Sequence, residues 1–248
     1  MNLEFELLAF GLITGFTSGF FGIGGGSILI PMLLVAGFAM KEAVAISIMQ
    51  MVFSSIYGSF LNSKKIKGLF RDGIILGVGA SVGGLFSGYF LPSIPDIYLQ
   101  YLFIAVLIYT IYTLFKAPAS QEVIQEDKNI FLLAFIGFCV GIFAMSIGIG
   151  GSLMLLPILV QFLKYDLKVA TALGLFFVIF SSIGGFISTS LYGNMLYYEG
   201  AIIGIGSLIG VYFGIKIKEK TKSTSYKKFV LLLNLFVLAT MIYKTVEF

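Results

Sequence analysis

Apolar residues gather along the chain into runs separated by short polar breaks. The runs cover residues 5–21, 27–38, 42–61, 73–91, 98–115, 130–147, 152–163, 169–191, 200–217 and 229–243. A helix needs about 17–25 apolar residues to cross a bilayer, and most of the runs come close to that length. The runs 27–38 and 152–163 are shorter, because at about 1.5 Å per residue each spans only roughly 18 Å as a helix. The pattern predicts an all-α polytopic membrane protein with two half-length helices.

Composition favours a membrane environment and narrows the chemistry. Of the 248 residues, 58% are hydrophobic and 11% are charged, and the mean hydropathy is +1.03. A soluble domain of this size would expose much of that apolar excess on its surface. The chain has no His and a single Cys, Cys139, which excludes catalytic triads, His-ligated zinc and an intrachain disulfide. We therefore expect no enzyme activity, no catalytic residue, no metal and no cofactor.

A glycine-rich segment, which we call a knot, precedes each half-length helix. The first knot is 22–27, and it contains Gly22, Gly24, Gly25, Gly26 and Ser27. The second knot is 148–152, and it contains Gly148, Gly150, Gly151 and Ser152. Glycine readily adopts backbone conformations that end a helix, so each knot is expected to break the chain at bilayer depth. Pro31 and Pro157 follow in the first two turns of the helices, where proline is best tolerated.

The two halves of the chain are related by an internal repeat. Residues 15–34 match 141–160 at a shift of 126, and residues 41–87 match 168–214 at a shift of 127. These blocks contain 24 identities in 67 aligned pairs, which is best explained by duplication, a signature of transporter folds. The polar stretch 116–129 lies between the halves. We therefore expect one membrane domain made of a first repeat at 1–115, a linker at 116–129 and a second repeat at 130–248.

The distribution of Lys and Arg predicts that the two repeats are inverted. The first-half loop 64–71 is strongly basic, whereas its counterpart 191–198 has no Lys or Arg; loop 92–96 has none, and 216–228 carries six Lys. Basic loops stay cytoplasmic, so equivalent loops lie on opposite sides. If each knot turns the chain back, 14 of the 16 basic residues fall inside, and only Lys41 and Lys244 fall outside. If the chain instead crossed the membrane at each knot, 7 basic residues would lie on one side and 9 on the other. We expect two inverted-topology repeats in a multi-pass cell (inner) membrane protein, each a glycine-broken helical hairpin plus three transmembrane helices, with both termini outside.

Opposed hairpins would bring the two knots together in the middle of the membrane. A helix start offers N–H groups without an intrahelical partner and the positive end of the helix dipole, so two such starts form an anion site without Arg or Lys. The predicted substrate-binding residues are those of the two knots. The competing interpretation is that the glycines only permit close helix packing.

Other polar residues inside the apolar runs are candidates for lining the path. They are Gln50, Ser54, Ser55, Thr171, Ser181 and Ser182. Ser and Thr in membrane helices often bond back to their own backbone, so a structural role is the alternative for each hydroxyl. No Asp, Glu, Lys or Arg is expected deep in any span. This favours coupling through neutral oxygens, as in a sodium site, or movement of the anion down its own gradient.

The doubled glycine motif resembles the sulfite exporter TauE/SafE family of membrane proteins over essentially the whole chain. The resemblance also rests on the Ala-x-Ala strings at Ala43 and Ala170 and on the spaced glycines of 73–84 and 200–210. It implies export of sulfite, an organosulfonate or a related sulfur-containing anion, and it assigns the site to the two knots with their prolines. The second knot departs from the first in having Ser152 aligned with Gly26.

The sequence is compatible with three functions. The leading interpretation is a secondary transporter for a small oxyanion. An anion channel would require a continuous polar stripe through several spans, and a non-transporting scaffold would not need two helix-breaking knots at bilayer depth. The expected partners are the anion and the lipid bilayer. The glycine-rich faces are compatible with a homodimer, and the Lys clusters act as topology signals, so no nucleic acid is expected.

Overall fold

The computed structural model describes residues 3–22, 24–62, 70–116, 129–165, 167–193, 195–221 and 223–247. Every regular element within these segments is a helix. Seven of the helices are long and apolar enough to cross a membrane, which defines a multi-pass membrane protein. The predicted linker 116–129 and basic loop 64–71 lie largely outside the described residues.

The helices follow the predicted runs closely. In chain order they are α1 (Leu3–Phe21), α2 (Gly26–Val35), α3 (Met40–Asn62), α4 (Phe70–Phe90), the short η2 (Leu91–Ser93), α5 (Asp96–Lys116), α6 (Ile130–Ser146), α7 (Ser152–Pro157), the π-helical η3 (Ile158–Phe162), α8 (Leu167–Tyr192), α9 (Tyr197–Lys220) and α10 (Ser223–Glu247). The helix after each knot is short, as predicted. One interpretation was wrong: 216–228 is not a loop, because α9 continues to Lys220 and α10 begins at Ser223.

Glycines allow helices from the two halves of the chain to pack backbone against backbone. A Cβ atom added at Gly11 would lie 2.3 Å from the Ile203 carbonyl oxygen, and one added at Gly15 would lie 2.1 Å from that of Ser207. These contacts join α1 to α9. The equivalent contacts join α6 to α4, because a Cβ at Gly137 would lie 2.2 Å from the Leu76 oxygen. Only glycine permits so close an approach.

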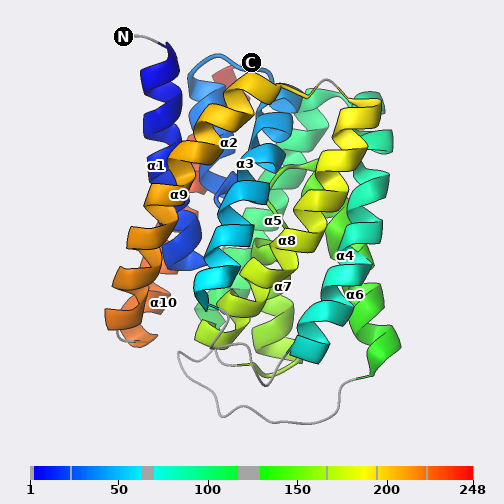
Figure 1. Ribbon diagram of the computed structural model, residues 1–248, viewed down its shortest axis with the longest axis vertical. Coiled ribbons are helices and arrows are strands. Elements are labelled where there is room, and N and C mark those ends of the chain that lie inside the picture. Colours follow the sequence, from blue (N-terminus) through cyan, green and yellow to red (C-terminus); the bar gives the residue numbers. More distant parts are fainter. Residues whose placement is uncertain are drawn as a thin grey trace.

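The order of these contacts gives the direction of each helix. Successive glycines of α1, at 11, 15 and 19, meet successive positions of α9, at 203, 207 and 211, so the two helices are parallel. The same reasoning makes α6 parallel to α4, α3 parallel to α9, and α4 parallel to α8. In Figure 1, α1 and α9 lie side by side, and the two chain ends are marked at the same end of the bundle.

Polar contacts tie the helix ends together at the two ends of the bundle. At one end the Lys227 ammonium donates to the Phe115 carbonyl over 3.2 Å, which joins the start of α10 to the end of α5. At the other end the Tyr198 hydroxyl donates to the Glu4 carboxylate, which joins the starts of α9 and α1. Between these ends, the described core combines a large hydrophobic cluster with many buried Ser and Thr side chains.

Candidate functional site

The two knots have the same backbone conformation. Gly22, Gly24 and Gly25 have φ angles of +69°, +79° and +77°, and their equivalents Gly148, Gly150 and Gly151 have +68°, +79° and +81°. These left-handed angles are readily accessible to glycine and costly for residues with a Cβ. The repeat therefore preserves the backbone conformation of the knots. Tight packing between helices would not by itself require this conformation.

Each knot ends in a glycine that caps the following helix. Gly25 is the N-cap of α2, and Gly151 is the N-cap of α7, and neither cap has a side chain that could occupy the free N–H groups. Helix α7 has six residues and runs directly into the five-residue π-helix η3. Pro157 lies at that junction, and its missing N–H favours the wider turn that follows. The sequence did not indicate this π-helix.

The knots lie in contact with each other. A Cβ atom added at Gly26 would lie 2.1 Å from the Gly148 carbonyl oxygen, so the start of α2 touches the second knot. The same oxygen accepts a 2.5 Å hydrogen bond from the Ser47 hydroxyl of α3. Two breaks that are more than a hundred residues apart in the sequence therefore share one place in the interior.

Several buried polar groups beside the knots have no hydrogen-bond partner within the described chain. The Ser27 hydroxyl, the Ser152 hydroxyl and both amide atoms of Gln50 are in this state, and all three residues are at most 1% exposed. The Gln50 amide faces the first knot, because a Cβ added at Gly25 would lie 3.0 Å from it. Burying an unpaired polar group costs free energy, so such groups usually have a bound partner. Ser152 and Ser27 belong to the predicted site, and Gln50 to the predicted path.

The remaining serine candidates for the path fall into three kinds. Ser54 and Ser182 donate to carbonyls three residues earlier in their own helices, as expected for structural hydroxyls. Ser181 also bonds within its helix, but it reaches the Gly150 carbonyl over 3.3 Å and so contacts the second knot. The Ser55 hydroxyl is buried and has no hydrogen-bond partner among the residues that the structure describes.

The sequence analysis did not single out Lys218, a buried lysine beside the first knot that lies near the end of α9 rather than deep in the span. Lys218 of α9 is 3% exposed and donates to the Thr171 hydroxyl over 2.9 Å. Thr171 packs against Gly22, whose added Cβ would lie 2.4 Å from the Thr171 carbonyl oxygen. The sequence did carry a signal, because Lys218 continues the buried face of α9 one turn after Gly214.

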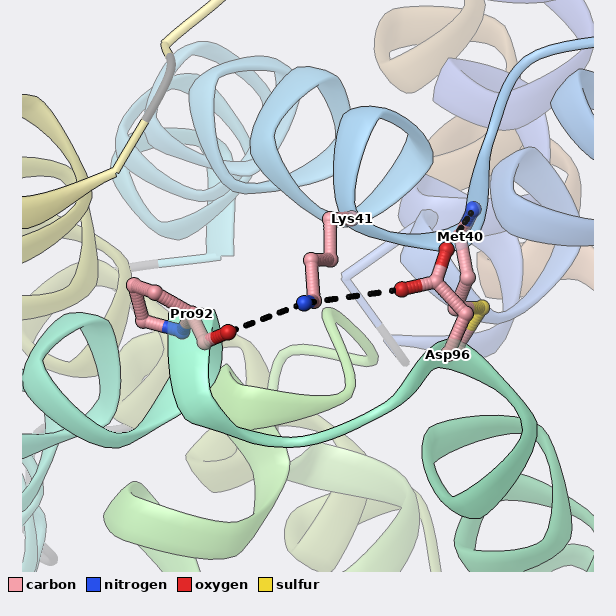
Figure 2. Close-up of polar contacts among 4 residues, drawn as sticks. All are labelled: Met40, Lys41, Pro92 and Asp96. Carbon is pink, nitrogen blue, oxygen red and sulfur yellow. Dashed lines mark hydrogen bonds and ion pairs between the residues drawn. The ribbon is translucent and has the colours of Figure 1, made fainter.

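A second polar cluster lies where α3 begins. Figure 2 shows Lys41 reaching the Pro92 carbonyl over 3.0 Å and the Asp96 carboxylate over 3.8 Å, while that carboxylate also accepts from the backbone N–H of Met40. The Lys41 side chain is 37% exposed, so the ion pair contributes little to stability. Lys41 therefore joins the start of α3 to η2 and to the start of α5. A cavity of about 300 Å³ opens beside it, between the start of α3 and the end of α8.

The apolar helices define a polytopic membrane protein. Residues 7–241 match the family described as sulfite exporter TauE/SafE, and the chain belongs to that family. A probable membrane transporter protein of Methanocaldococcus jannaschii is 29% identical over 244 residues, covering 89% of this chain and 91% of the relative. A probable membrane transporter protein of Haemophilus influenzae is 25% identical over 252 residues, covering 98% and 97%. One from Bacillus subtilis is 25% identical over 210 residues, covering 82% and 86%.

Proposed function

We propose that this chain is a secondary transporter of the cell (inner) membrane that exports a small oxyanion, such as sulfite or an organosulfonate. The anion binds between the two knots, where two helix starts meet. The observation that carries this proposal is the contact between two knots of the same backbone shape, beside three buried polar side chains that have no hydrogen-bond partner in the described part of the chain.

The helix starts supply the attraction for an anion. Free N–H groups of α2 and of the α7–η3 segment point toward the knots, and each helix adds the positive end of its dipole. The Ser27 and Ser152 hydroxyls and the Gln50 amide add neutral donors. An oxyanion with several acceptor oxygens can use donors from both sides at once, whereas chloride gains less from directional donors. These donors hold an anion mainly through neutral groups, because the buried ammonium of Lys218 donates to the Thr171 hydroxyl beside the first knot. Binding through neutral donors permits release.

The directions of the helices support the inverted-hairpin arrangement. Helices α1 and α3 both run parallel to α9, so α2 between them returns toward the side from which α1 came. Likewise α6 and α8 both run parallel to α4, so the α7–η3 segment also returns. Because α8 and α9 are joined by a short connection and run in opposite directions, α6 opposes α1. The two repeats, 1–115 and 130–248, are then inverted relative to each other, as in many secondary transporters.

Anion uptake into proteoliposomes tests this function. Purified protein would be reconstituted, and uptake of labelled sulfite, sulfate, thiosulfate, organosulfonates and chloride would be measured under imposed sodium and proton gradients. We expect saturable uptake of at least one sulfur oxyanion, with counterflow that distinguishes a carrier from a channel. Uptake of every oxyanion at the rate of protein-free liposomes would contradict the proposal.

A further inference from the structure

Met51 and Val178 hold equivalent positions in the two repeats, at the shift of 127, and both of them contact both knots. A Cβ added at Gly24 would lie 3.3 Å from the Met51 Sδ and 3.3 Å from a Val178 methyl carbon. A Cβ added at Gly150 would lie 2.5 Å from the same sulfur and 3.4 Å from the other Val178 methyl carbon. Both side chains are fully buried. The thioether and the valine methyl groups therefore fill the space between the knots.

This packing leaves the knots covered. The Met51 sulfur also lies 3.2 Å from the place of a Cβ at Gly26, so it contacts three glycines at once. An oxyanion carries several oxygens around a central atom and needs more room than a single added Cβ. On the side of the knots formed by Gly24, Gly26 and Gly150, an anion can approach the backbone only if one of these two apolar side chains moves.

The two side chains differ in how easily they can move. Methionine is unbranched, has three rotatable side-chain bonds and adapts to irregular space. Valine is branched at Cβ, and one χ1 rotamer dominates when it lies in a helix, as Val178 does in α8. Met51 of α3 is therefore the side chain that changes conformation, whereas Val178 stays in one rotamer.

We infer that Met51 and Val178 form an apolar constriction between the knots, in which Met51 is the movable gate and Val178 the fixed wall that sets the size of the anion admitted. The inference rests on the proposed anion site and adds two specificity-determining residues to it. Apolar constrictions also exclude water and ions until they open, so the gate keeps the path closed when no substrate is bound.

Transport selectivity is the first test, with a matched control on the same helix. Met51→Ala enlarges the constriction, so the uptake of a bulky sulfonate such as benzenesulfonate relative to sulfite should rise about tenfold, the usual scale for a change in pocket size. Met49→Ala removes the same atoms two residues away, where Met49 packs on Gly200 instead of the knots, and should leave the ratio unchanged. Val178→Ala should shift the ratio in the same direction as Met51→Ala. A ratio equal to the parent's in both folded variants would overturn the gate.

Labelling of a cysteine provides a test that does not depend on transport. In a Cys139→Ala background, Ser152→Cys places a thiol at the second knot, and its rate of modification by a sulfonate-bearing methanethiosulfonate reagent is measured. We expect Met51→Ala to speed the modification about tenfold and Met49→Ala to leave it unchanged. Equal rates in all three proteins would overturn the gate even if sulfite is transported. Faster labelling in Met51→Ala without any oxyanion transport by the parent would instead uphold the gate and contradict the proposed function.

Discussion

The Ser47 hydroxyl donates a 2.5 Å hydrogen bond to the Gly148 carbonyl, and this bond fastens the knot of the second half to a helix of the first. Both groups are buried, so loss of the hydroxyl leaves the carbonyl without this donor. The bond has no copy across the repeat, because the position equivalent to Ser47 is Gly174. The two knots thus share a shape but are held in place differently.

Removal of this tether should weaken the protein and the site together. Ser47→Ala is expected to lower the free energy of unfolding by about 1–3 kcal/mol, the cost of an unsatisfied buried group. Thermal unfolding in detergent would measure the loss. Ser87→Ala is the matched control, since Ser87 is equally buried but bonds only to Gly84 in its own helix. An equal loss in both variants would show that the tether has no special role.

Substitution of the knot glycines should abolish transport. Gly24→Leu and Gly150→Leu each place a bulky side chain against Met51, at a left-handed φ of +79° that costs an L-residue about 1–2 kcal/mol. We expect both proteins to insert into the membrane without sulfite uptake in proteoliposomes.

Gly37→Leu separates backbone strain from blockage of the site. Gly37 also has a positive φ, +96°, but a Cβ there would meet nothing within 4 Å. This variant should retain transport. Parental rates in Gly24→Leu or Gly150→Leu would mean that the knot concerned is structural only.

Lys218 should matter for transport, whereas its exposed neighbour should not. Lys218 holds Thr171 against Gly22, so Lys218→Met is expected to reduce sulfite uptake at least about tenfold, because a hydrogen bond from a charged donor contributes about 1.5–3 kcal/mol. Lys216→Met changes an exposed lysine one half-turn away and should have little effect. Equal uptake rates in the two variants would show that Lys218 has no specific role in transport.

Both chain termini should face outside the cell. The hairpin arrangement places only Lys41 and Lys244 on that side, in agreement with the cytoplasmic preference of basic residues. A C-terminal alkaline phosphatase fusion should be active, since this enzyme works only outside the cytoplasm, and a C-terminal green fluorescent protein fusion should be dark when exported unfolded. Fluorescence of the second fusion with inactivity of the first would contradict the hairpins.

The sequence was sufficient for the helices and the knots because their causes are local. Apolar run length predicts a membrane helix, and repeated glycines at 22 and 148 predict a break wherever they occur. The sequence could not reveal what fills the space between the knots. Met51 and Val178 look like ordinary apolar core residues, and only the packing of α3 and α8 against both helical hairpins brings them to both knots. Lys218 was missed for a related reason: a lysine near a helix end is usually solvated, and burial depends on where α8 and α10 lie.

Equilibrium binding of sulfite to the purified protein tests the central claim most directly. Isothermal titration in detergent would compare the parent with Ser27→Ala, Ser152→Ala and the control Ser207→Ala, whose buried hydroxyl bonds within its own helix. We expect sulfite to bind, each knot variant to weaken binding by about 0.5–1.5 kcal/mol, and the control to match the parent, because only the knot variants lose a hydrogen bond to the anion. Sodium and ammonium salts of an inert anion should give no binding heat. Heat from those salts, with none from sulfite or any other oxyanion, would contradict the account.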